Sequence, residues 1–209
     1  MKKFIGIAVL GFLLGVSGAG GRKAVAAEKA SLKALNVTGS VMVHRAGKIV
    51  TIHEGDAIQV GDQMMTNGDS FLDVVKAGAW GYRLLQSGDC KITRSNDDTS
   101  QIELNQGNII FNVNPNMGQR FSVKTPVVVA AVRGTQFWGQ VTPSGEKHNA
   151  IFAVREGKVE VTVIQSKEKF LLEAGQAIEI KGEAGTAGRR AAKATELEAL
   201  RQATTIPFK

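Results

Sequence analysis

Short runs of alternating apolar and polar residues occupy most of the chain between residues 35 and 181. In Asn36–His44, for example, Val37, Val41 and Val43 share one face, and turn-forming residues separate this run from the next. Such alternation is typical of half-buried β-strands, and helical periodicity is missing from windows of about eleven residues in this region. The pattern predicts an all-β domain of many short antiparallel strands, arranged either as a roll of the jelly-roll type or as a stacked β-sandwich.

The remaining strands follow from the same pattern. They are expected at Ile49–His53, Ala57–Val60, Phe71–Val75, Trp80–Leu85, Cys90–Thr93, Ile102–Leu104, Ile109–Val113, Ala150–Val154, Val159–Ile164, Phe170–Leu172 and Ala177–Ile180. In four weakly repeated units a glycine stands shortly before an apolar residue, at Gly55, Gly107, Gly157 and Gly175. A glycine at such a place supplies positive φ where one strand ends and the next begins.

The longest apolar run beyond the N-terminal region is Phe121–Val141, which is rich in β-branched and aromatic residues. Two breakers divide it. Pro126 cannot donate a ladder hydrogen bond, so Thr125-Pro126 predicts a strand start or edge. Gly134 predicts a bulge or a close backbone approach. This run is therefore expected to be the packing centre of the domain.

Arg133 stands inside this run, between Val132 and Gly134. A guanidinium among apolar residues either reaches water through its long side chain or finds a carboxylate partner. We expect Arg133 to be half-buried and to join strands through a bidentate bond to Glu156 or Glu173.

Two tryptophans are candidates for a binding surface. Alternation along the strand places one ring of Phe137-Trp138 inside and the other outside. An outward Trp138, near Arg133 or Trp80, would suit contact with a partner or a glycan. Packing of either ring in the core is the favoured interpretation.

The N-terminal residues 1–26 are predicted to be a secretory signal peptide. Lys2 and Lys3 are followed by the apolar segment Phe4–Val16 and by Ala24-Val25-Ala26, which resembles a cleavage site. The apolar segment is shorter than the roughly 20 residues needed to span a bilayer, so an uncleaved anchor is the less favoured alternative. Cleavage would leave no stable membrane span, and export places the protein in a bacterial periplasm.

The domain boundaries follow from these segments. Residues 1–26 are the signal peptide, residues 35–181 form the β-domain, and residues 182–209 form a linker and a C-terminal helical tail. Gly182–Gly188 has the composition of a flexible linker. Arg189–Gln202 contains helix formers with a narrow apolar stripe, and Glu198 is placed to pair with Arg201 or Gln202. The helix either docks on the β-domain or a partner, or frays.

Net charge does not indicate a nucleic-acid partner. The whole chain has a formal charge of +7, but the leader carries four of its 26 basic residues and none of its 19 acidic residues, which leaves +3. The remaining basic residues are scattered among acidic ones. The single cysteine, Cys90, excludes an intramolecular disulfide and is expected to be a small buried apolar residue rather than a reactive thiol.

Candidate catalytic chemistry is sparse. His44 and His53 flank a predicted turn and, with Glu54, could build a cupin-like metal site, although exposed strand histidines are the simpler interpretation. Several Gly-Asp pairs between residues 54 and 69 suggest calcium loops, but the spacing of a calcium-binding loop is absent and Gly-Asp is an ordinary turn pair. We therefore expect no enzyme activity, no cofactor and no metal.

The residues also carry a family resemblance. Thr125-Pro126 followed by Val132-Arg133-Gly134-Thr135-Gln136-Phe137 resembles the T-P...V-R-G-T-x-F core of the FecR-type periplasmic domain, and the likeness extends over roughly residues 35–180. The structural motif it implies consists of Thr125, Pro126, Arg133, Gly134, Thr135 and Phe137. Ala77-Gly78-Ala79 departs from the D-G-S-like turn more usual in the family.

The resemblance implies a role in signalling across the envelope. The namesakes sense an occupied outer-membrane transporter and control a sigma factor through a cytoplasmic N-terminal segment. Only Met1–Lys3 precede the apolar leader here, so a direct anti-sigma role is not expected. The hypothesis is an exported, non-catalytic binding or signalling-associated module with an envelope protein as partner. A carbohydrate-binding or envelope-polymer-binding module and a cupin-like metal-dependent enzyme are the alternatives.

Overall fold

The computed structural model describes residues 32–182 and 186–208; the predicted signal peptide lies outside them. The strands are β1 (Leu32–Thr38), β2 (Val41–Arg45), β3 (Lys48–Thr51), β4 (Ala57–Ile58), β5 (Gln63–Thr66), β6 (Phe71–Lys76), β7 (Trp80–Leu84), β8 (Asp89–Ser95), β9 (Thr99–Val113), β10 (Arg120–Lys124), β11 (Val128–Ser144), β12 (Lys147–Val163), β13 (Lys169–Glu173), β14 (Gln176–Lys181) and β15 (Thr186–Ala191). Helix α1 (Ala194–Arg201) and the short 3-10 helix η1 (Gln202–Thr205) follow. The predicted all-β fold with a short C-terminal helix is confirmed.

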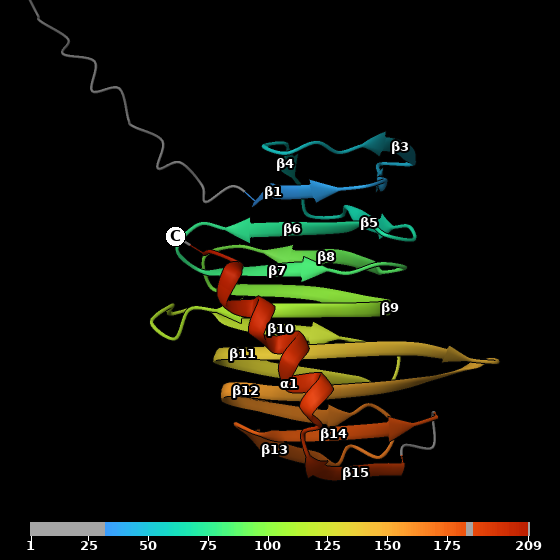
Figure 1. Ribbon diagram of the computed structural model, residues 1–209, viewed down its shortest axis with the longest axis vertical. Coiled ribbons are helices and arrows are strands. Elements are labelled where there is room, and N and C mark those ends of the chain that lie inside the picture. The colour runs from blue at the N-terminus through green and yellow to red at the C-terminus, as the bar shows by residue number, and fades with distance from the viewer. Residues whose placement is uncertain (1–31, 183–185, 209) are drawn as a thin grey trace, which may run out of the picture.

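The strands form one hydrogen-bonded sheet that folds over into two layers (Figure 1). In the layer that we call layer A, the order is β15, β14, β12, β11, β9, β7, β6, β1 and β4. In layer B it is β13, β12, β11, β10, β9, β8, β5, β2 and β3. Nearly all neighbours are antiparallel, whereas β9 and β10 run parallel.

Three long strands, β9, β11 and β12, belong to both layers because each bends at a glycine. Gly107, Gly134 and Gly157 have φ values of 92°, 61° and 80°. The part of β12 before Gly157 pairs with β14, and the part after it pairs with β13. The predicted turns at residues 106–108 and 155–158 are therefore bends inside continuous strands. Positive φ was expected at these glycines, but the ladder hydrogen bonds that carry each strand past the bend were not visible in the sequence.

The main core lies between the two layers and is built by aromatic residues from both. Phe111 of β9 packs against Phe121 of β10, with ring centroids 5.5 Å apart, and stacks on Phe137 of β11 at 4.6 Å. Tyr82 of β7 reaches across to β5, where its hydroxyl lies 3.9 Å from the Met64 sulfur. Alternation along the strands directs these side chains inward, so the sequence pattern and the core agree.

The C-terminal segment packs on the outer face of layer A, where α1 crosses the strands (Figure 1). Leu200, Ala203 and Ile206 are fully buried there against Ile110 and Trp138. We call residues 194–208 the C-terminal strap. The tail therefore docks, and the predicted pair between Glu198 and Arg201 forms at 3.1 Å.

Two predictions about the C-terminal region are corrected. The proposed linker at residues 182–188 overlaps β15, because residues 186–191 pair with β14 as an additional edge strand. The predicted helix from Arg189 to Gln202 begins only at Ala194. Sheet hydrogen bonds with β14 satisfy the backbone of residues 186–191, and that tertiary contact overrides the helix propensity of Arg189, Arg190 and Ala191.

Candidate functional site

A groove of about 550 Å³ lies on the outer face of layer B, and three arginines surround it. We call it the arginine groove and define it by Arg94, Arg120 and Arg133. The other lining residues are Thr99, Met117, Gly118, Gln119, Phe121, Ser122, Ala131 and Val132. Its volume falls in the range of known small-molecule pockets.

Strand register explains why Arg120 and Arg133 lie together. β10 and β11 pair antiparallel with Phe121 opposite Val132 and Ser122 opposite Ala131. Phe121 and Val132 are buried in the core, so the next residue outward on each strand, Arg120 and Arg133, faces solvent. Because successive side chains alternate in direction, the apolar residues that build the core force the two arginines onto the same outer face.

Arg94 closes the opposite side of the groove. It lies on β8 opposite Gln101 of β9, while Thr99 of β9 pairs with Arg120. One strand, β9, thus separates Arg94 from β10. With strands spaced about 4.8 Å apart, the backbones bearing Arg94 and Arg133 are about 14 Å apart. The hydroxyls of Thr99 and Ser122 lie among the groove lining between them.

The three guanidinium groups make no ion pair with any described residue. Carboxylates on neighbouring strands are already engaged: Glu103 with Lys124 at 2.8 Å and Glu173 with Lys158 at 2.7 Å. Asp98 contacts Arg120 only through backbone atoms, its carbonyl accepting from the Arg120 N–H at 2.9 Å. Like charges grouped without partners create a positive potential that attracts anions.

The predicted role of Arg133 is wrong. Its side chain is exposed, and it bonds neither Glu156 nor Glu173. The bulge at Gly134 shifts the register, so that Arg133 lies opposite Lys158 while Glu156 lies opposite Gln136. Lys158 takes Glu173 instead. A one-residue change in register decides which charges meet across a sheet, and the sequence does not reveal it.

The other residues of the predicted structural motif support the fold. Thr125 is buried, and its hydroxyl accepts from the backbone N–H groups of Val127 and Val128 at 3.3 and 3.0 Å, which shapes the turn from β10 to β11. Pro126 is the residue inside that turn. Gly134 has positive φ, and a Cβ there would collide with the backbone of Pro115. Thr135 and Phe137 are buried beside it.

The two tryptophans do not form an exposed surface. Trp80 is fully buried between the layers, where it stacks on Tyr82 at 5.9 Å. Trp138 points out of the roll, as alternation predicted, but the C-terminal strap covers it and leaves it 8% exposed. The possible aromatic binding surface is therefore not formed, and burial of both tryptophans agrees with the favoured interpretation.

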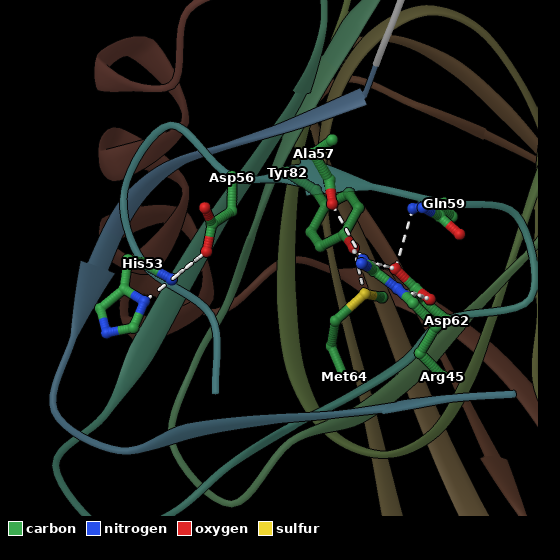
Figure 2. A network of polar contacts seen from close by, with 8 residues as sticks. All are labelled: Arg45, His53, Asp56, Ala57, Gln59, Asp62, Met64 and Tyr82. Carbon is green, nitrogen blue, oxygen red and sulfur yellow. Dashed lines mark hydrogen bonds and ion pairs between the residues drawn. The ribbon is translucent and has the colours of Figure 1, made fainter. Parts of the chain in front are cut away.

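The histidine site considered as an alternative does not assemble. His44 on β2 lies opposite Ile49 and Gln63, so it is not a cross-strand neighbour of His53. His53 lies in the loop after β3, where its backbone N–H donates to the Asp56 carboxylate at 2.8 Å (Figure 2). Within residues 32–182 and 186–208, no group of three His, Cys, Asp or Glu side chains is placed to hold a metal ion.

The Gly-Asp pairs serve turns and ion pairs. Asp62 is 1% exposed and forms a bidentate bond with Arg45, at 2.8 and 2.6 Å (Figure 2). Its carboxylate also accepts from the backbone N–H of Gln59 at 2.8 Å, and Arg45 donates to the Ala57 carbonyl at 2.9 Å. The hydrogen bond to Asp62 raises the pKa of Arg45. This cluster fastens the loop around β4 to β2.

Cys90 is buried beside Tyr82, with its sulfur 3.7 Å from the phenol oxygen. Burial raises the pKa of its thiol from 9.0 to about 12. A thiol held neutral in this way is a poor nucleophile, as expected for a small packed side chain.

The family comparison agrees with the motif. Residues 63–160 match the family model described as FecR protein, so this part of the chain is a FecR domain. It includes β5 to β11, most of β12, and all the residues that define the arginine groove.

Solved structures show the same fold. Two crystal structures, at 2.50 and 1.65 Å, of a protein described as "a putative anti-sigma factor from Parabacteroides distasonis ATCC 8503" are similar, each with a TM-score of 0.55 and 22% sequence identity. The similarity covers 67% of this chain and 64% of the other, less than two thirds of that protein's length. No curated protein matches this chain. None of the helices described is long and apolar enough to cross a membrane.

Sequence reasoning singled out Arg133 but missed Arg94, Arg120 and the groove itself. The signal available in the sequence was the alternation of apolar and polar residues along each strand. In β10, Phe121 and Val123 are apolar while Arg120, Ser122 and Lys124 alternate with them. An outward cation could therefore be placed on each strand. The parallel pairing of β9 with β10 that brings the cations together comes from the tertiary structure.

Proposed function

We propose that this protein is an exported, non-catalytic FecR-domain module of the bacterial cell envelope that takes part in signalling by binding another envelope protein. The observation that carries this proposal is the arginine groove, a solvent-open surface on the sheet whose three guanidinium groups have no ion pair among the described residues. Sheet strands fix the positions of these groups, so little ordering is required when a partner binds. The FecR domain supports a regulatory context.

Export is tested first. The full chain with a C-terminal tag is expressed in its bacterial host, the periplasmic fraction is collected, and the N-terminus of the purified protein is determined by mass spectrometry. We expect the mature protein in the periplasmic fraction, starting near Ala27. An intact Met1 on a cytoplasmic protein would refute the export part of the proposal.

Binding is tested by photo-crosslinking in living cells. A photoreactive amino acid replaces Ala131, an exposed residue of the groove, and in a matched control it replaces Thr142, an exposed residue of the β11–β12 hairpin. We expect Ala131 to crosslink to an outer-membrane or sensor protein, identified by mass spectrometry, and Thr142 not to do so. Crosslinks only to peptidoglycan or another glycan would refute a protein-binding role.

A further inference from the structure

We propose that the arginine groove binds an acidic peptide segment of the partner, lying across strands β8 to β11 with its carboxylates on Arg94, Arg120 and Arg133. This inference rests on the proposed function and specifies the chemistry of the partner. The groove is the place where three cations without an ion pair among the described residues lie together. Lys91 of β8 also has no ion pair among the described residues, but it does not line the groove.

The distribution of paired and unpaired charges carries the argument. On the outer face of layer B, Lys124 has Glu103, Lys158 has Glu173 and Lys169 has Glu160. The groove arginines instead have no carboxylate among the described residues, and Arg133 lies opposite another cation, Lys158. Like charges on directly opposite residues destabilise a sheet. Glu173 balances Lys158, but no described carboxylate balances Arg133, so an anionic ligand would supply the missing countercharge.

The residue type and spacing favour carboxylates on an extended chain. Arginine presents a planar fork that matches a carboxylate through two parallel hydrogen bonds. In an extended peptide, side chains on one face repeat about every 7 Å, and the groove arginines span about 14 Å across the strands. Acidic residues at alternate positions of a peptide can therefore meet the arginines at both sides of the groove.

The same lining disfavours a sugar as the ligand. Carbohydrate binding commonly uses an exposed aromatic face, but the one aromatic residue that lines the groove, Phe121, is 2% exposed. The tryptophans are buried elsewhere. Hydroxyls of Thr99 and Ser122, together with the partly buried Met117, offer hydrogen bonds and apolar contact to the backbone and side chains of a peptide.

The test uses the full mature protein and a fluorescein-labelled decapeptide of alternating glutamate and serine, measured by fluorescence anisotropy at low salt. The control peptide has glutamine in place of glutamate. We expect saturable binding of the acidic peptide that weakens as salt is added, and no saturable binding of the control. Equal binding of the two peptides would overturn the inference.

Variants locate the site. Arg120→Gln and Arg133→Gln alter exposed side chains and leave the core intact. Each exposed ionic contact contributes modestly, so each substitution is expected to weaken binding about threefold and the double variant about tenfold. Arg201→Gln, an exposed arginine on α1, is the matched control and should change nothing. Circular dichroism and thermal unfolding verify that the variants fold. An unchanged affinity in the double variant, or an equal loss in Arg201→Gln, overturns the assignment.

Other anions are separate outcomes. Competition by inorganic phosphate or by an anionic polysaccharide, measured at constant ionic strength and at concentrations where the glutamine peptide has no effect, would overturn the choice of a peptide. The failure of this inference is distinguishable from failure of the proposed function. If the double variant no longer binds the acidic peptide but still crosslinks to its envelope partner, the acidic-peptide assignment for that partner fails and the function stands.

Discussion

The ion pair between Arg83 and Asp73 permits the most direct test of the fold. Asp73 on β6 is fully buried, and its two carboxylate oxygens accept from Arg83 of β7 at 2.7 Å each. Asn36 of β1 donates to the same carboxylate at 2.7 Å. The pair thus joins three neighbouring strands of layer A. Arg83 is only 15% exposed, so water screens it little.

We expect Arg83→Met to destabilise the protein strongly, because it leaves a buried carboxylate with one neutral donor. Breaking a buried pair on one side costs about 3–5 kcal/mol. For a domain of this size each kcal/mol shifts the melting temperature by about 2–4 °C, which gives a decrease of about 6–20 °C. The contact between the Arg83 guanidinium and the Phe71 ring, at 4.6 Å, adds a smaller loss.

Differential scanning calorimetry of four proteins measures this effect: the native chain, Arg83→Met, the double variant Asp73→Asn with Arg83→Met, and Arg201→Met. The double variant removes the orphaned charge and should recover part of the loss. Arg201 and Glu198 are 74% and 66% exposed, so Arg201→Met should shift the melting temperature by less than about 2 °C. A similarly small shift in Arg83→Met, or a double variant no more stable than the single one, would refute the reasoning.

Three further predictions follow from individual contacts. Gly157 and Gly175 both have a φ of 80°, but a Cβ at Gly157 would collide with the Gly134 carbonyl, while one at Gly175 meets nothing within 4 Å. Chemical denaturation should therefore show Gly157→Ala to be less stable than Gly175→Ala by about 1–3 kcal/mol. Equal free energies of unfolding would contradict the close approach at the bend. Because burial raises the pKa of Cys90 to about 12, a thiol reagent at pH 8 should modify it only after unfolding, and rapid modification of the native protein would show the packing to be wrong. The hydrogen bond from Arg190 lowers the pKa of Glu196 below its ordinary value of 4.5, so the stabilisation by this ion pair is present above pH 4.5 and is lost as the pH falls through the folded-state pKa. Trp138 fluorescence should report release of the strap in acid, and Glu196→Gln should reduce that acid dependence. An identical pH profile in Glu196→Gln would exclude this cause.

Much of the fold could be predicted because it depends on local pattern. The positions of β6, β7, β8 and β14 agree with the expected strands to within a residue or two, since alternating apolar residues can bury one face only in an extended strand. β9 and β12 were each expected as two strands. Whether a glycine ends a strand or bends it depends on whether neighbouring backbones continue the hydrogen bonds, which is a tertiary property.

The candidate site was less predictable. Arg133 drew attention as a cation in an apolar run, but its partner depended on a register shift. Trp138 was placed correctly on the outer side of its strand, yet its exposure depended on a helix more than fifty residues further along the chain. Arg94 and Arg120 are separated by 25 intervening residues and meet only because β10 pairs parallel with β9.

The sequence by itself determined that this protein is built of β-strands, which side chains face inward, and that the run Phe121–Val141 lies at the centre of a FecR domain. Periodicity and turn chemistry are local, so one chain suffices to read them. Only the tertiary structure decided how the strands bend from one layer to the other, which of the described charges are paired, and where the arginines that have no partner in residues 32–182 and 186–208 gather. Those outcomes depend on register and on contacts between distant segments, and the groove that we propose as the binding site is one of them.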